Sequence, residues 1–384
     1  MTVELPRGPD NKRRRRTICR KSKAAAIKAL REAQAELAAG KLDGDKAPTV
    51  SEWFTYWLEQ VIPASDARPS TVRGYRAPVK QHIIPALGRT PIDQLRAADV
   101  RDLTNRITST PKKMAYRLLD PEDVPDDADY LTGAYAKNVY DILRMGLTAA
   151  VAESVIKHHP LDKVRAPSVE VRDRRGLTLP QAVTLLEHLE GHPDRALFFT
   201  YLYTGARRGE VLGLEVERVS DVMDLAWQLQ RISNIRDAPR SFEYRHLHRN
   251  LYLTRPKSKA GTRIVPLVNP LADVLRAHIG DRATGLVFVG PDGLAENPDR
   301  ITDRWKAALK DAGLPGDIVL HGARHTAVTL MYAAGIPEPI IREIVGHSDI
   351  EMTRHYRDPS EMAALREAMM KLSRHIAPPA ALEA

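Results

Sequence analysis

The chain has 384 residues, which is long enough for two or three domains, and its formal net charge is +9. This charge favours a polyanionic partner, and the 5% of aromatic residues favours a nucleic-acid duplex over single strands, which proteins bind by stacking bases on aromatic rings. The single cysteine, Cys19, excludes a disulfide framework and a cysteine-based zinc site, and no apolar run is long enough for a membrane span, so we expect a cytoplasmic protein.

The first 47 residues are strongly basic. This stretch contains four consecutive arginines, Arg13, Arg14, Arg15 and Arg16. An amphipathic helix is predicted after them, over 24–39. We interpret residues 1–47 as a small DNA-binding module in which the four arginines contact phosphates. The alternative is a disordered basic tail or a nuclear-type signal.

Residues 48–162 are predicted to form a mainly helical domain. Thr49 and Glu52 have the spacing of a capping box, which opens a helix that runs to Val61. Further helices are predicted from apolar periodicity over 70–84, 97–107 and 132–156. Between 108 and 131, prolines and acidic residues indicate an inserted loop that is unsuited to DNA contact.

The predicted helix over 70–84 has a basic face. Arg73 and Arg76 are three residues apart, and Arg76 and Lys80 are four apart, so the three side chains lie on neighbouring turns. We select these three residues as candidates for contact with DNA phosphates. The alternative is an ordinary solvated helix face. Pro78, in the same segment, predicts a kink.

Residues 163–175 are predicted to be a basic linker, and a second domain is expected over 176–358. An apolar helix over 196–204 should end at Gly205, so that Arg207 projects from the turn or from the start of the next helix. A guanidinium binds phosphate oxygens in a planar, bidentate manner. Arg207 is therefore a candidate for one half of a phosphate clamp.

A small sheet is expected next. Strand-like segments lie over 226–232, 249–254 and 263–267. We interpret 234–247 as an insertion between strands. The connection between the last two strands contains Lys257 and Lys259, and we expect it to be a hairpin.

A second group of candidate residues begins near 320. His321 and Arg324 are three residues apart, so on a helix they share a face. This helix should stop at Gly335, and a second one, which Pro337 can start, should end at Gly346.

His347 then lies in the joint before a third helix, which Ser348 and Glu351 start with capping-box spacing and which carries Tyr356. A phenol is a poor nucleophile at neutral pH. It becomes effective when cations hold a phosphodiester in front of it and a nearby group accepts its proton. The pattern therefore indicates phosphoryl transfer, for which no metal is needed.

Three motifs stand in a fixed order along the chain. They are TGARRGE over 204–210, HGAR over 321–324, and Gly346-His347 with Tyr356 nine positions after the histidine. With this order and spacing, over roughly 175–356, the chain resembles the tyrosine recombinase (phage integrase) family. The resemblance implies a multidomain fold: a small basic N-terminal DNA-binding module, an all-α SAM-like core-binding domain, and a mainly α catalytic domain with a small antiparallel β-sheet. A tail helix follows, over 359–384.

The resemblance implies that Arg207 and Arg324 bind the non-bridging oxygens of the scissile phosphate. His347 donates a further hydrogen bond to that phosphate. Glu210, one helical step from Arg207, is expected to orient the Arg207 guanidinium.

The remaining roles concern proton transfer and attack. By the resemblance, Tyr356 attacks the phosphorus and keeps the DNA 3′ end, while His321 accepts the tyrosine proton. Lys259, which we prefer to Lys257, protonates the departing 5′ oxygen. The chemistry needs no cofactor, metal or ATP.

The resemblance implies an integrase of a phage or an integrative plasmid. Such a protein recombines double-stranded DNA attachment sites as a homotetramer on DNA, with an excisionase and a host DNA-bending protein as further partners and without a membrane. The tail helix either packs on its own domain or is donated to a neighbouring protomer. The alternatives are a Xer-like dimer resolvase, a catalytically silent DNA-binding regulator and a type IB topoisomerase. The basic N-terminal module favours the integrase.

Overall fold

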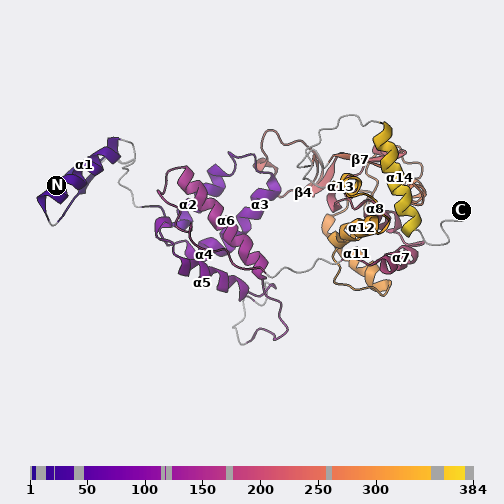
Figure 1. The fold of residues 1–384 in the computed structure, drawn as a ribbon, viewed down its shortest axis with the longest axis horizontal. Helices are drawn as coiled ribbons and strands as arrows, with labels where there is room; N and C mark the ends of the chain where they lie inside the picture. Colours follow the sequence, from indigo (N-terminus) through magenta and orange to yellow (C-terminus); the bar gives the residue numbers. More distant parts are fainter. Residues whose placement is uncertain are drawn as a thin grey trace. The chain divides into compact units, whose positions relative to one another are not determined.

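The chain folds into two compact units in the computed structural model (Figure 1). One unit comprises Met1–Ala67 and Thr71–Glu170, and the other comprises Arg68–Ser70 and Val171–Ala384. The structure describes residues 2–5, 14–20, 22–38, 47–113, 117, 123–169, 176–256, 262–346 and 359–376. Within these residues, no helix has the length and apolar character that crossing a membrane requires.

The N-terminal residues form a strand pair and a helix. Strand β1 (Thr2–Leu5) pairs antiparallel with β2 (Arg14–Thr17), and α1 (Lys23–Ala38) follows and lies against β1. The helix agrees with the predicted segment over 24–39, whereas β1 was not predicted. Of the four arginines, Arg13 lies outside the described residues and the other three are on β2.

The rest of the first unit is helical. Its elements, in chain order, are α2 (Val50–Tyr56), the π-helical turn η1 (Trp57–Val61), α3 (Pro69–Pro78), the π-helical turn η2 (Val79–Ile83), α4 (Ile84–Leu87), the 3₁₀ turn η3 (Ile92–Gln94), α5 (Ala97–Thr108) and α6 (Gly133–Ala152). The predicted capping box is confirmed, because the Thr49 side chain accepts from the backbone N–H of Glu52 and the Glu52 carboxylate accepts from that of Thr49.

Two helices of this unit approach closely. The indole N–H of Trp53, on α2, donates to the carbonyl of Gly146, on α6, at 2.8 Å. A Cβ at Gly146 would lie 2.4 Å from the Phe54 ring, so glycine lets the helices meet around the buried aromatic side chains. Further along the chain, α3 runs through Pro78 and widens into η2, because proline offers no N–H to the preceding turn. A π-helical turn therefore follows Pro78, at the place where the sequence predicted a kink.

The second unit is built around a buried helix, α8. Its elements are α7 (Leu179–His188), α8 (Arg195–Thr204), α9 (Arg208–Leu212), the 3₁₀ turns η6 (Val216–Arg218) and η7 (Ile235–Asp237), β3 (Val222–Leu225), β4 (Gln228–Arg231), β5 (Tyr244–His248), β6 (Leu251–Thr254), β7 (Arg263–Pro266), α10 (Leu271–Ile279), α11 (Pro298–Asp311), α12 (Leu320–Ala333), α13 (Glu338–Val345) and α14 (Pro359–Ile376). Every residue of α8 from Ala196 to Thr204 is buried. Helix α12 packs against it (Figure 1), and so does α10.

The strands correct two sequence expectations. The segment 234–247 is more than an insertion, because it contains most of β5, which pairs antiparallel with β6. The expected hairpin between β6 and β7 is wrong: β6 pairs with β4, whereas β7 pairs with β3. Only Ala226 and Trp227 separate β3 from β4, so β6 and β7 pair with two strands that are neighbours in the sequence. Local alternation could not reveal this pairing, because it does not show which strands are partners.

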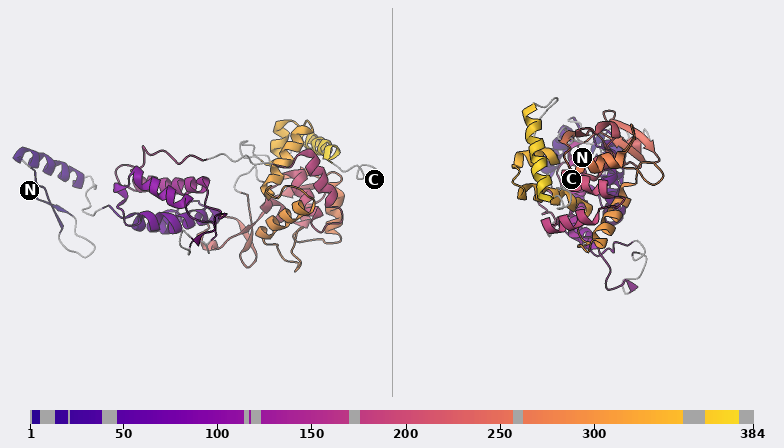
Figure 2. Two further views of the ribbon diagram at one scale, coloured as in Figure 1. Left: turned by 90° about the horizontal axis from the view of Figure 1, so that it is seen from below. Right: turned by 90° about the vertical axis from the view of Figure 1, so that its right-hand side faces the viewer.

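Helix α14 packs on its own unit. Figure 2 shows it in yellow beside the orange helices, and it lies against α12, α13 and β7. Its buried stripe includes Leu365, Met369 and Leu372, and the Ser373 hydroxyl donates to the carbonyl of Asn269. The first of the two expected arrangements of the tail helix is therefore the one in this structure.

Candidate active site

Arg207 is fixed by the start of α9. Helix α8 ends at Gly205, whose left-handed backbone (φ 58°, ψ 20°) turns the chain as predicted. Arg207 is then the extended N-cap residue of α9. The Glu210 carboxylate, three residues later, accepts from the backbone N–H of Arg207 and from its Nη1, both at 2.8 Å. The prediction that Glu210 orients Arg207 is confirmed.

Glu210 also binds an arginine that the sequence interpretation missed. Arg263, on β7, donates from Nη2 to Glu210 Oε2 at 3.0 Å, and both side chains are at most 2% exposed. Burial by itself would raise the pKa of Glu210, but Arg263 and Arg207 outweigh it and hold the pKa below its ordinary value. The sequence did contain a signal that Arg263 is buried. Arg263 and the apolar Val265 are two residues apart, so on a strand they share one face.

Arg324 approaches the same place from α12. It is 6% exposed, and its Nη1 donates to the carbonyls of Gly205 and Val345, each at 2.7 Å. Burial, together with the positive charges of Arg207 and Arg263, lowers the pKa of Arg324 to about 9. The guanidinium therefore keeps its charge at neutral pH.

The three arginines meet at the C-terminal end of α13, which Gly346 closes in a left-handed conformation as predicted. Three consecutive carbonyls there each accept a hydrogen bond from a different arginine. The pairs are Arg263 with Ile344 at 2.7 Å, Arg324 with Val345 at 2.7 Å, and Arg207 with Gly346 at 3.1 Å. The last carbonyls of a helix carry partial negative charge, so they are suitable partners for cations.

The cluster as a whole is cationic. Three arginines and one carboxylate give it a formal charge of +2, from three positive charges and one negative charge. The Arg207 side chain is 42% exposed, whereas Arg263 and Arg324 are buried. An anion can therefore reach Arg207 at the surface, with two further positive charges behind it. This arrangement suits a phosphate.

His321 and Arg324 are both in the first turns of α12, as predicted. The His321 side chain is exposed, and its ring contacts that of His325 edge-on, with 5.2 Å between ring centroids. The part of the chain that the structure describes contains no group of three or more His, Cys, Asp or Glu side chains that could hold a metal ion.

Three of the predicted catalytic residues, Lys259, His347 and Tyr356, lie outside the described residues, as does Lys257. The structure does fix chain positions next to them, at Pro256, Thr262 and Gly346. The predicted catalytic residues that it brings together are therefore Arg207 and Arg324, with His321 on the same helix as Arg324.

The DNA-contact candidates Arg73, Arg76 and Lys80 lie on one helical stretch. Arg73 and Arg76 are on α3, and Lys80 is on η2. The side chains of Arg73 and Lys80 are exposed, and that of Arg76 is half-buried. These positions are compatible with phosphate contact.

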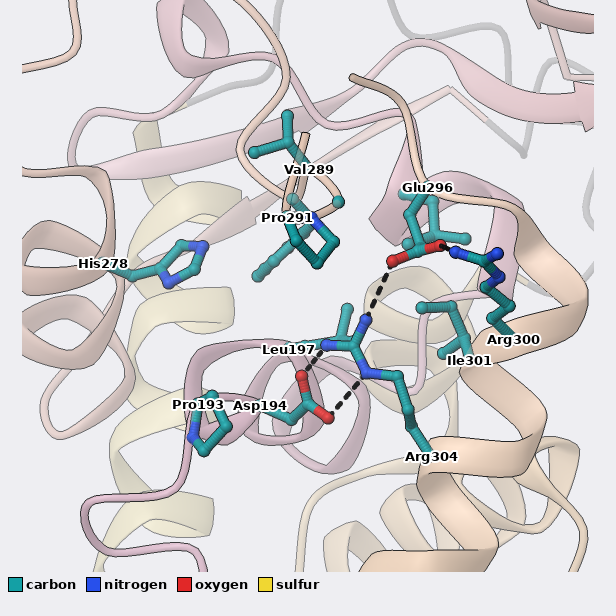
Figure 3. A pocket seen from close by; sticks show the side chains of 13 residues that line it. Pro193, Asp194, Leu197, His278, Val289, Pro291, Glu296, Arg300, Ile301 and Arg304 are labelled. Atoms are coloured by element: carbon teal, nitrogen blue, oxygen red, sulfur yellow. Dashed lines mark hydrogen bonds and ion pairs between the residues drawn. The ribbon is translucent and has the colours of Figure 1, made fainter. Parts of the chain in front are cut away.

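A cavity of about 480 Å³ lies elsewhere in the second unit (Figure 3). Figure 3 shows Arg304 between Asp194 and Glu296, and both carboxylates bind its guanidinium. Arg300 faces Glu296 from the other side, at 3.9 Å. The charged groups of this cavity pair with one another, and the cavity is not lined by any of the arginines at the end of α13.

Comparison with known proteins gives matches over both units. The sequence model of the phage integrase family matches residues 175–362, and that of the phage integrase N-terminal SAM-like domain matches residues 49–108. An integrase of Saccharopolyspora erythraea is 24% identical to this chain over an alignment that covers 92% of this chain and 89% of that protein.

Solved structures share the fold. The integrase of the Tn1549 transposon, in complex with transposon right-end DNA, has a TM-score of 0.60 at 19% identity, over 83% of this chain and 98% of that one. A lambda integrase tetramer bound to a Holliday junction has a TM-score of 0.55 at 17% identity, over 91% and 94% of the two chains.

Proposed function

The chain belongs to the phage integrase family, and we propose that it is a tyrosine recombinase that cuts and rejoins DNA strands at specific sites. One observation carries this proposal. Arg207 and Arg324, which are 117 positions apart in the sequence by subtraction (324 − 207), bind consecutive carbonyls directly ahead of His347. Two cations held together in this way suit one phosphate.

In the proposed reaction, Arg207 and Arg324 bind the non-bridging oxygens of the scissile phosphate and stabilise the negative charge that grows on them. His347 follows Gly346, whose carbonyl accepts from Arg207, and donates a further hydrogen bond to the same phosphate. Glu210 keeps Arg207 in place.

The bond changes balance without a metal or ATP. The phenol oxygen of Tyr356 bonds to phosphorus while the bond from phosphorus to the 5′ oxygen breaks. His321 takes the phenol proton, and Lys259 gives a proton to the 5′ oxygen. The resulting 3′-phosphotyrosine ester conserves the bond energy, so the 5′ hydroxyl of a partner strand can reverse the reaction.

We propose that the biological role is the integration and excision of a mobile element of phage or plasmid origin. The similarity to the Saccharopolyspora erythraea integrase extends over 92% of the chain, more than the catalytic unit alone. Residues 1–47, with the strand pair and α1, are proposed to bind a second DNA site. Arg73, Arg76 and Lys80 are proposed to contact the phosphates of the exchanged site.

The proposed working form is a homotetramer on two double-stranded attachment sites, with an excisionase and a host DNA-bending protein as partners. Exchange of all four strands needs four nucleophiles, and one chain offers one. The structure of the lambda integrase tetramer on a Holliday junction supports this stoichiometry for a protein of this fold.

The nucleophile is the part of the proposal that can be tested most directly. The wild-type chain, mixed with a nicked duplex that contains the junction between element and host DNA, should form a covalent protein–DNA adduct that survives denaturing electrophoresis. The Tyr356→Phe variant should bind this duplex and form no adduct. Tyr332→Phe, which alters a tyrosine that is 51% exposed on α12, is the matched control and should form adduct normally. An adduct with Tyr356→Phe would assign the nucleophile elsewhere.

The absence of a metal requirement is tested separately. Adduct formation should be unchanged in EDTA. Strong inhibition by EDTA would instead support metal-dependent nuclease chemistry.

A further inference from the structure

Arg263 is the most deeply buried of the three clustered arginines and has no part in the reaction described above. It is the first residue of β7, and its side chain is 2% exposed. Its Nη2 binds Glu210, and its Nε donates to the carbonyl of Ile344 at 2.7 Å. One guanidinium therefore connects the sheet to the carboxylate that holds Arg207 and to the end of α13.

The charges show why a second arginine is needed behind Glu210. Glu210 is 1% exposed and accepts from the guanidinium of Arg207 at Oε1 and from that of Arg263 at Oε2, where the backbone N–H of Arg207 also donates. If Glu210 were bound by Arg207 alone, the two charges would cancel, and Arg207 would offer a phosphate little net attraction. Arg263 neutralises the carboxylate from the buried side. The positive charge of Arg207 then remains available on its exposed side.

The geometry requires an arginine in particular. Two partners of Arg263 lie in different directions, one on α9 and one at the end of α13, and the planar guanidinium reaches both with separate N–H groups. A lysine at this position has a single ammonium group on a flexible stem and matches such a divided arrangement poorly. Arg263 thus fixes the distance between Glu210 and the carbonyl two residues ahead of Gly346.

We propose that Arg263 is a positioning residue for strand cleavage, which keeps the phosphate clamp cationic by neutralising Glu210 and holds the end of α13 against it. The inference rests on the proposed function, because it concerns the same site. Arg263 does not contact the phosphate in this proposal, and it affects the rate of cleavage rather than the affinity for DNA.

The first experiment compares Arg263→Gln and Arg263→Lys with the wild-type chain. It measures single-turnover cleavage, with saturating protein, of the nicked duplex that contains the junction between element and host DNA. DNA affinity is measured in parallel by fluorescence anisotropy, and folding by thermal unfolding. Removing one preorganised donor that contacts the transition state slows an enzyme by about 10²–10³-fold. Arg263 acts less directly, through Glu210, so Arg263→Gln should slow cleavage by about tenfold to a hundredfold. The cleavage rate of Arg263→Lys should lie between the rates of Arg263→Gln and the wild-type chain. The dissociation constant for the duplex should stay near the wild-type value.

The second experiment separates charge from general loss of structure. A duplex with a neutral methylphosphonate at the scissile position has one negative charge fewer at that phosphate. If Arg263 keeps the clamp cationic, the defect of Arg263→Gln relative to wild type should be much smaller on this duplex. An equal defect on both duplexes would mean that Arg263 only stabilises the fold, which would overturn the proposal.

The third experiment uses the double variant Arg263→Gln with Glu210→Gln, which removes both buried charges and leaves a pair that can still form hydrogen bonds. It should fold where Arg263→Gln alone is unstable, and it should cleave faster than Arg263→Gln. Wild-type rates in Arg263→Gln, or no recovery in the double variant, would overturn the proposal. Failure of the proposed function is recognised independently, because the wild-type chain itself would then form no Tyr356-dependent adduct.

Discussion

Arg324 donates a hydrogen bond of 2.7 Å to the carbonyl oxygen of Gly205, which lies two residues ahead of Arg207. The buried arginine of the proposed clamp thus holds the turn that presents the exposed one. The backbone of Gly205 is left-handed, and a Cβ there would lie 3.2 Å from the Cβ of Ala327 and 3.3 Å from Val345. Glycine lets the end of α8 sit between α12 and α13.

Gly205→Ala should therefore weaken both stability and cleavage. The left-handed conformation costs a non-glycine residue roughly 1–2 kcal/mol, and here the added methyl group must also push α12 and α13 apart. Gly191→Ala is the matched control, because Gly191 also has a positive φ (71°) but has nothing within 4 Å of an added Cβ. Both variants should lower the free energy of unfolding in urea, and Gly205→Ala should also slow single-turnover cleavage. Equal cleavage rates in the two variants would show that the turn does not control the clamp.

Arg207→Ala should slow cleavage by about 10²–10³-fold, the usual effect of removing one group that stabilises charge in the transition state. Its neighbour Arg208 provides a control of the same residue type, since Arg208 binds the carbonyl of Pro298 and the hydroxyl of Thr302 on α11. Arg208→Ala should change the cleavage rate little. A similar loss in both variants would argue that the positive charge of the region matters more than the position of Arg207.

Glu210→Gln should destabilise the second unit by about 3–5 kcal/mol, because it leaves the buried Arg263 without its carboxylate. Asp299→Asn is the control, since Asp299 is 59% exposed in its ion pairs with Arg208 and Arg231 and such pairs contribute about 0–1 kcal/mol. Urea unfolding of each variant at neutral pH measures the difference. Similar small losses in both would show that the buried pair is not a main support of this unit.

The same carboxylate predicts a pH dependence. The pKa of Glu210 is lower in the folded chain than its ordinary value of 4.5. A carboxyl group with a lowered folded pKa stabilises the fold above its unfolded pKa, and this contribution is lost as the pH falls through the folded pKa. Wild-type stability should therefore decline as the pH falls below about 4.5, and Glu210→Gln should show a shallower decline. Parallel profiles of the two proteins would assign the acid sensitivity to other groups.

Lys259→Ala and Lys257→Ala should differ in one diagnostic respect. A sulfur atom in place of the 5′ oxygen at the scissile bond leaves without protonation, because a thiol is far more acidic than an alcohol. If Lys259 is the general acid, Lys259→Ala should cleave the ordinary duplex slowly and the sulfur-containing duplex at nearly the wild-type rate. Lys257→Ala should cleave both duplexes normally. The reverse pattern would exchange the roles of the two lysines.

Deletion of residues 1–47 separates an integrase from a simple dimer resolvase. The truncated chain should still form the Tyr356 adduct on a duplex that contains the exchanged site alone. It should lose recombination between complete attachment sites, because the proposed second DNA contact is gone. Full recombination by the truncated chain would favour the resolvase.

The sequence allowed the order of helices around the site to be predicted because turns have local causes. Gly205, Gly335 and Gly346 were each predicted to end a helix, and all three have positive φ in the structure. Arg207 could be selected as a phosphate-binding candidate for the same reason, since its position after the end of α8 depends on the neighbouring Gly205.

Long-range pairing was beyond such reasoning. The bond between Arg263 and Glu210 joins residues 53 positions apart, and no periodicity relates them. The hairpin expected between β6 and β7 was wrong for the same reason, because strand partners are chosen by the whole sheet.

The connection 255–262 has a consequence for how proteins of this kind can diverge. It joins β6 to β7, whose partners β4 and β3 are already neighbours in sequence. Residues can therefore be added or removed there while the register of each strand pair stays unchanged, since neither pairing depends on the length of this segment. A lineage could alter the length of this connection without rebuilding the arginine cluster, provided that Lys259, the proposed general acid, is kept within it.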